Sequence, residues 1–140
     1  MIRVVDASVL IKAYIPEAGS EQAGAWFVRV EEGAVELLAP DLIYPETGNI
    51  LWKKVRRGEL TEAEAREIGA AIGSLPLRIE AGRTLLPLAL DIALACGVTV
   101  YDALYVALAG VYDTRMLTAD GKLVALLENT PLAGQVELLV

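Results

Sequence analysis

The chain has 140 residues, 55% of them hydrophobic, and 12 Lys and Arg against 19 Asp and Glu give a net charge of −7 at neutral pH. Because it has one cysteine and no histidine, the chain excludes internal disulfides, Cys/His zinc sites and catalysis by histidine. Carboxylates remain as the groups for chemistry, and they favour hard divalent ions such as Mg²⁺ or Mn²⁺.

Length and hydropathy predict one domain, residues 1–140, with a sizeable core. No apolar run approaches the ~18 residues that span a bilayer, and the N-terminus lacks the basic and long apolar regions of an export signal. We therefore expect a cytoplasmic protein without a membrane partner. The acidic charge balance, taken alone, argues against a nucleic-acid binder, whose usual surface is basic.

The first predicted element is a buried strand over residues 2–5, which stops at Asp6. The apolar residues after Ser8 have helical spacing, so Asp6 lies between a strand and a helix. Ligands of open α/β sheets bind at the carboxyl ends of strands, which makes Asp6 a candidate for chemistry. The alternative for Asp6 and Ser8 is that each only caps the helix.

Short strands and helices alternate along the rest of the chain. Ser20 is predicted to cap a helix that ends at Gly33, and Asp41 to open a helix that ends near Gly58. An apolar segment after residue 101 predicts a central helix. The predicted strands cover residues 2–5, 36–39, 77–80, 115–118 and 136–139.

Four acids fall where these elements begin or end. Asp6, Asp102 and Asp120 lie at the ends of extended segments or the starts of helices, and Glu46 lies early in the helix after the second strand. Alternating strands and helices would bring the four to one edge of a sheet. Each also has an ordinary explanation, because a helix N-terminus stabilises a carboxylate and most helical Glu residues are solvated.

Four segments carry a recognisable pattern: residues 4–10 (VVDASVL), Pro45-Glu46 with Asn49 one turn later, residues 101–105 (YDALY) and residues 118–123 (TADGKL). In this order and spacing, over nearly the whole chain, they resemble PIN-domain ribonucleases of the VapC toxin type. The resemblance implies an α/β fold, a three-layer α/β/α arrangement with a central, mostly parallel five-stranded sheet. It also implies Mg²⁺- or Mn²⁺-dependent RNA cleavage, a cognate antitoxin and a homodimer.

By this resemblance Asp6, Glu46, Asp102 and Asp120 are expected to be the catalytic, metal-binding acids, with Asp6 and Asp102 as direct ligands. Three further residues are expected to orient these carboxylates: Ser8, Asn49 and Thr118. Clustered carboxylates repel one another unless cations neutralise them, and a bound ion can activate water for hydrolysis of a phosphodiester. Ser8 and Thr118 are equally well explained as caps or turn residues.

A basic pair follows Glu46 on the same predicted helix. Lys53 and Arg57 come seven and eleven residues later, so helical geometry places them on the face that carries Glu46. This spacing predicts an RNA-binding track. The alternative is that these cations only complement the helix C-terminus and remain solvated.

Other functions compete with the ribonuclease. A receiver-like phosphoacceptor domain would need paired acids after the first strand and a lysine such as Lys122, yet only Asp6 is present there. A haloacid-dehalogenase-like phosphatase needs an Asp-x-Asp pair and fails for the same reason. A non-catalytic binding or assembly module of the same fold would not need four acids. The many apolar residues predict that part of the surface lies in an interface.

Overall fold

The computed structural model describes residues 1–139, which contain one five-stranded sheet of order β3–β2–β1–β4–β5. Every pairing between neighbouring strands is parallel, which confirms the predicted sheet. β1 lies in the middle of the sheet, and its last two residues, Val4 and Val5, are fully buried, as expected for a central parallel strand. The strands are β1 (Ile2–Val5), β2 (Glu36–Pro40), β3 (Arg78–Glu80), β4 (Met116–Thr118) and β5 (Val136–Leu138).

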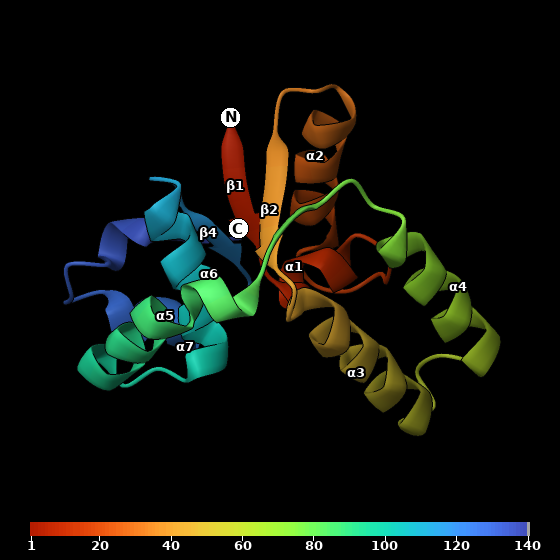
Figure 1. Cartoon of the computed structure of the whole chain (residues 1–140). Helices are drawn as coiled ribbons and strands as arrows, with labels where there is room; N and C mark the ends of the chain where they lie inside the picture. Colours follow the sequence, from red (N-terminus) through yellow and green to blue (C-terminus); the bar gives the residue numbers. More distant parts are fainter. Residues whose placement is uncertain (140) are drawn as a thin grey trace.

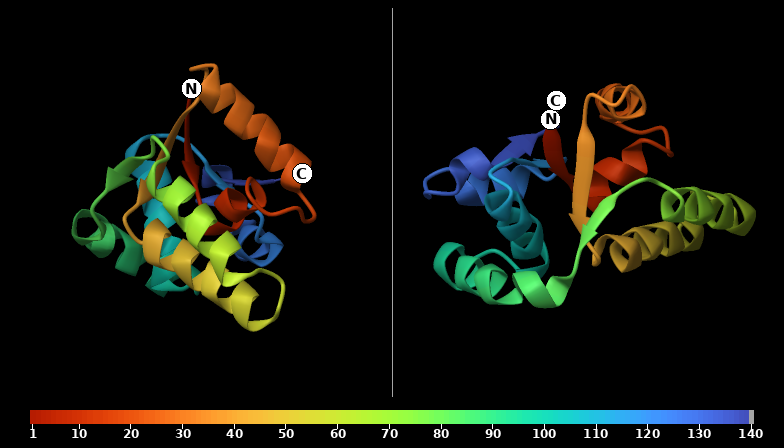
Figure 2. Two further views of the ribbon diagram at one scale, coloured as in Figure 1. Left: turned by 90° about the vertical axis from the view of Figure 1, so that its right-hand side faces the viewer. Right: turned by 45° about the horizontal axis from the view of Figure 1, so that its top comes forward.

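Helices cover both faces of the sheet and confirm the three-layer α/β/α arrangement. Figure 1 and Figure 2 show α5, α6 and α7 on one side of β1 and β2, and α1 to α4 on the other. Within residues 1–139 the helices are α1 (Ala7–Lys12), α2 (Ser20–Glu31), α3 (Ile43–Arg56), α4 (Glu62–Gly73), α5 (Gly82–Cys96), α6 (Val100–Val111) and α7 (Gly121–Leu127), with a short 3₁₀ turn at Ala133–Gln135.

The core is centred on β1 and α6. Val4 and Val5 of β1 are fully buried, and the seven consecutive residues from Ala103 to Ala109 of α6 are buried as well. Complete burial of a Val or Leu side chain contributes roughly 1.5–3 kcal/mol, so this helix is a major source of stability. The prediction of a central helix from its apolar sequence is confirmed.

The ends of the helices follow local signals in most places. Thr61 and Glu64 form both hydrogen bonds of a capping box at the start of α4. Ser20, however, is the first residue of α2 and does not cap it. Asp41 lies two residues before α3, and its carboxylate accepts a hydrogen bond from the Gly82 N–H at the start of α5. Asp41 therefore caps the distant helix α5 and not the helix that follows it in the sequence. Local residue spacing cannot reveal such a contact.

No single helix among residues 1–139 could cross a membrane. In residues 1–139 no one helix is both long and apolar enough to cross a bilayer, and α5 with α6 reaches that length and composition only as a pair bent by 114°. Most of α6 is buried against the sheet and α5. These helices therefore pass along the domain core in this structure.

Candidate functional site

Asp6 lies where two neighbouring strands end. The register between β1 and β4 pairs Val5 with Leu117, so Asp6 lies beside Thr118, the last residue of β4. Thr118 Oγ1 donates to Asp6 Oδ2 at 2.5 Å, Ser8 Oγ donates to Oδ1 at 2.6 Å, and the Val9 N–H donates to Oδ1 at 3.1 Å. Asp6 thus caps α1 and is also held by two hydroxyl groups, with only 8% of the residue exposed.

Asp120 is joined to the same loops through backbone hydrogen bonds. Its N–H donates to Thr118 Oγ1 at 3.1 Å, and the neighbouring Ala119 N–H donates to Ser8 Oγ at 3.2 Å. Asp120 also caps α7, because its Oδ1 accepts from two N–H groups in the first turn of that helix. Its carboxylate is exposed. Ser8 and Thr118 therefore connect Asp6 and Asp120 in one hydrogen-bonded network.

Glu46 and Asp102 come from α3 and α6. Tyr105 Oη donates a 2.6 Å hydrogen bond to Glu46 Oε1, and the tyrosine is 2% exposed. Asp102 lies one turn before Tyr105, and its backbone N–H donates to the capping hydroxyl of Thr99. The first turn of α3 is thereby tied to the first turns of α6.

The four acids are close enough to influence one another. Burial raises the pKa of Asp6, Glu46 and Asp102, and in Asp6 the hydrogen bonds from neighbouring groups oppose the rise. The charge of Asp102 raises the pKa of Asp6 and Glu46 further, and the charge of Asp120 does so for Asp102. Among residues 1–139 no Lys or Arg forms an ion pair with any of the four.

This donor set fits a hard divalent cation by its chemistry. The site offers carboxylate oxygens and an excess of negative charge without a cationic partner. Within the described part of the chain, however, no three Asp, Glu or Cys side chains are already gathered around one point that could hold an ion. Direct coordination of one ion by three of these side chains at once would therefore need side-chain rearrangement.

The predicted basic residues lie beside the acids. Lys53 and Arg57 line a cleft of about 460 Å³ that also contains Ser8 and Asp120. Glu46 faces a different, smaller pocket of about 230 Å³. The basic pair therefore lies on the Asp120 side of the site, and Glu46 lines a separate pocket.

Asn49 lies in the smaller pocket with Glu46 and Tyr101. Asn49 is exposed, and in residues 1–139 no hydrogen bond joins its side-chain amide to any of the four acids. An orienting role for Asn49 therefore stays a prediction.

Sequence reasoning gave no role to Tyr105, Lys12, Lys54 or Glu17. Tyr105 carried a usable signal, because it follows Asp102 by three residues and shares its helical face. Lys12 follows Ser8 by four residues on α1, and both line the larger cleft. Glu17 had no such signal, since it lies in a loop whose position depends on tertiary contacts.

The comparison with family models decides the classification. A model of the PIN domain matches residues 3–127. The chain belongs to the PIN-domain family. Ribonuclease VapC3 of Pyrobaculum aerophilum is 42% identical to it over 122 residues, which cover 86% of this chain and 90% of that protein. The resemblance to PIN domains of the VapC type is thus confirmed.

Solved structures agree with this PIN-domain assignment. The crystal structure of PAE2754 from Pyrobaculum aerophilum has a TM-score of 0.68 and 26% identity, covering 90% of this chain and 79% of that one. A toxin–antitoxin complex from Klebsiella pneumoniae has a TM-score of 0.64 and 12% identity, covering 99% and 98% of the two chains. At 12% identity the second likeness shows the fold alone.

Proposed function

We propose that this PIN-domain protein is a metal-dependent endoribonuclease that hydrolyses phosphodiester bonds of RNA. The observation that carries the proposal is the set of coupled carboxylates, Asp6, Glu46, Asp102 and Asp120, without a cationic partner in residues 1–139. The name of the 42% identical relative, Ribonuclease VapC3, supports the same activity. Mg²⁺ or Mn²⁺ is the proposed cofactor.

The proposed roles are those that the resemblance to PIN-domain ribonucleases implies. Asp6 and Asp102 would hold the ion, and Glu46 and Asp120 would complete the site directly or through water. A divalent ion, when bound, supplies Lewis-acid stabilisation of phosphate charge and activates a water. The hydroxyls of Ser8 and Thr118 fix both oxygens of Asp6.

Tyr105 orients Glu46 in the same way that Ser8 and Thr118 orient Asp6. Its hydroxyl binds one oxygen of Glu46 and leaves the other for a ligand. Because Tyr105 is buried, its position is set by core packing. No residue here needs to act as a histidine-type general base, since the carboxylates can accept the proton from water.

We also propose that the protein is a cytoplasmic homodimer and the toxin of a toxin–antitoxin pair, inhibited by a cognate antitoxin. The relationship to VapC3 and the fold shared with a toxin–antitoxin complex support this assignment. An exposed stripe on α5, formed by Leu86, Leu90 and Leu94, supports an apolar interface. Light scattering of the purified protein would test the dimer.

The experiment that tests the activity is incubation of purified protein with a mixed RNA pool. Reactions contain Mg²⁺, Mn²⁺ or a chelator, and Asp6→Asn is the control variant. We expect cleavage with either metal and none with chelator or with the variant. Absence of cleavage, together with no metal binding by calorimetry, would favour the alternative of a non-catalytic binding module.

A further inference from the structure

The cleft beside the acids has a charge opposite to that of the whole protein. Three of the four lysines in the chain line it, although the net charge is −7. The charged side chains of its lining are Lys12, Lys53, Lys54 and Arg57, against Glu17 and Asp120. A local excess of cations in an acidic protein indicates a site for an anion.

Glu17 bridges two of these cations. Its Oε1 lies 3.1 Å from Lys12 Nζ, and its Oε2 lies 3.4 Å from Lys54 Nζ. One carboxylate therefore joins the end of α1 to the last turns of α3. Lys54 also lies 3.6 Å from Glu59, a residue outside the lining of the cleft.

Both lysine side chains are largely covered, although their hydrogen bonds to Glu17 lie at the surface. Each side chain is 16% exposed, against 77% for Arg66 in the ion pair with Glu62. Two covered lysine stems hold their ammonium groups close to one carboxylate, so the position favours an anion between them. Glu17 is the carboxylate that faces both Lys12 and Lys54, and Lys54 keeps Glu59 as a second, more distant partner.

The loop before α2 is arranged to present Glu17. The Glu17 N–H donates to Ser20 Oγ at 2.8 Å, and that hydroxyl donates to the Ile15 carbonyl at 3.0 Å. Gly19 has a φ of +91°, and a Cβ there would lie 3.2 Å from Lys12 Cδ. A glycine at this position permits both the left-handed backbone and the close approach to the lysine stem.

We propose that the cleft is a phosphate-binding subsite for RNA, in which Lys12 and Lys54 bind a backbone phosphate that displaces the carboxylate of Glu17. The proposal rests on the proposed ribonuclease function. Two carboxylate oxygens can take the place of two phosphate oxygens against the same ammonium groups. Since Ser8 and Asp120 line the same cleft, RNA bound there would lie next to Asp120.

Glu17 then weakens RNA binding, because it competes with phosphate for the two lysines. A ligand must supply enough phosphate contacts to replace an existing ion pair. Neutralising Glu17 removes this competitor, so RNA binding should become tighter and more dependent on salt. For single strands each additional phosphate contact adds about 0.7 to the slope of log K against log salt concentration.

The test is fluorescence anisotropy with a labelled single-stranded RNA in chelator, so that binding is measured without cleavage. We expect Glu17→Gln to bind about 3- to 10-fold tighter than wild type at low salt, with a slope steeper by about 0.7 to 1.4. Lys12→Gln with Lys54→Gln should weaken binding, and should abolish the gain when added to Glu17→Gln.

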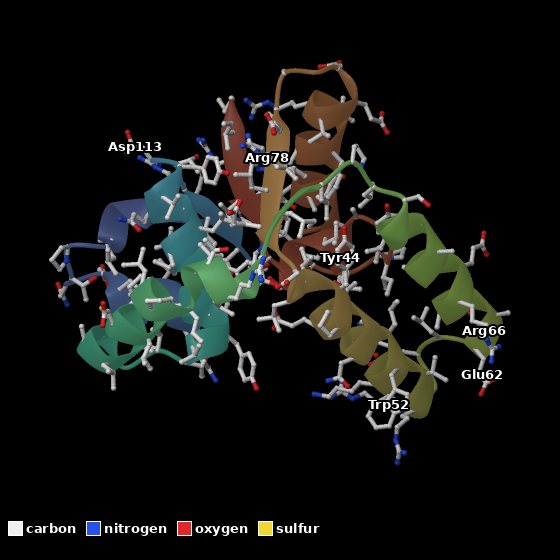
Figure 3. The ribbon with its side chains drawn as sticks, in the orientation of Figure 1. Tyr44, Trp52, Glu62, Arg66, Arg78 and Asp113 are labelled. Carbon is white, nitrogen blue, oxygen red and sulfur yellow. The ribbon has the colours of Figure 1, made fainter. Side chains whose placement is uncertain are left out.

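Glu36→Gln is the matched control. It removes the same charge and breaks an ion pair of 3.5 Å with Arg78, which lies beside β2 (Figure 3). Glu36 is the first residue of β2 and lies at the amino ends of the strands, whereas Asp6 lies at their carboxyl ends. We expect its RNA affinity and salt slope to match those of wild type within twofold.

Thermal melting in low salt gives a second readout. Glu17→Gln leaves two lysines facing one another, so its melting temperature should fall, and inorganic phosphate should restore it more than in Glu36→Gln. Equal RNA affinity and salt slope of Glu17→Gln and Glu36→Gln would overturn the subsite, even if wild type cleaves RNA. Failure of wild type to cleave, with the binding shift present, would overturn only the ribonuclease.

Discussion

Tyr105 and Glu46 are 59 residues apart in the sequence, and their side chains are joined by a 2.6 Å hydrogen bond. The hydroxyl belongs to the central helix α6, and the carboxylate belongs to α3. Burial raises the pKa of Glu46, and the hydrogen bond from Tyr105 opposes that rise. The core helix therefore controls both the position and the ionisation of one candidate catalytic acid.

Tyr105→Phe should keep the ring packing and remove only this bond. The Glu46 pKa should then rise, so the acid limb of the pH–rate profile should move to higher pH, and kcat/KM should fall about 10-fold or more. The measurement is cleavage of a fluorescent RNA across pH. Tyr112→Phe, which removes a tyrosine hydrogen bond to Glu80, is the control. An unshifted profile in Tyr105→Phe would contradict the positioning role.

Asp102→Asn should change stability in a pH-dependent way. Because the folded-state pKa of Asp102 is raised, its ionisation destabilises the fold. That cost is absent below the ordinary aspartate pKa of about 3.9 and develops as pH rises through the folded value. In chelator, the melting temperature of the variant should therefore exceed that of wild type at pH 7 and match it near pH 4.

Differential scanning calorimetry of the two proteins from pH 4 to 8 measures this difference. Mg²⁺ should raise the melting temperature of wild type more than that of Asp102→Asn, because the ion neutralises the repulsion. A constant difference at every pH would mean that repulsion among the acids does not explain the change. Cleavage activity of the variant should be lost under all of these conditions.

The double variant Lys53→Ala, Arg57→Ala should bind RNA more weakly. Both residues line the cleft next to Asp120, so their loss should flatten the salt dependence by about one to two phosphate contacts. Turnover at saturating RNA should change little. Arg66→Ala is the control, because Arg66 lies on the outer part of α4 (Figure 3). An unchanged slope of log affinity against log salt concentration would mean that Lys53 and Arg57 are solvated and do not contact RNA.

The proposed antitoxin should compete with divalent metal. The four acids lack a cationic partner within residues 1–139, so an inhibitor arginine could form bidentate contacts with Asp102 or Asp120. Antitoxin affinity should decrease along a Mg²⁺ titration, and Asp102→Asn and Asp120→Asn should weaken it. Isothermal titration calorimetry measures both effects. Affinity insensitive to metal and to these substitutions would place inhibition at an apolar surface away from the acids.

The sequence by itself predicted the strands and suggested the kind of chemistry that we propose. Short apolar-rich segments predicted all five strands, the acidic motifs pointed to one end of those strands, and the lack of histidine left carboxylates as the proposed catalytic groups. These features are local, because strand and helix periods are set by which side chains face the core. The family resemblance came from the same local segments, and the family match confirmed it.

Only the tertiary structure decided how distant side chains meet. The parallel register of β1 and β4 brings Thr118 to Asp6, and the packing of α6 places Tyr105 against Glu46. Glu17 contacts Lys12 and Lys54 because a loop and two helices converge on one cleft. Hydrogen bonds and ion pairs depend on distances of a few ångströms between elements, and no periodicity along the chain encodes those distances.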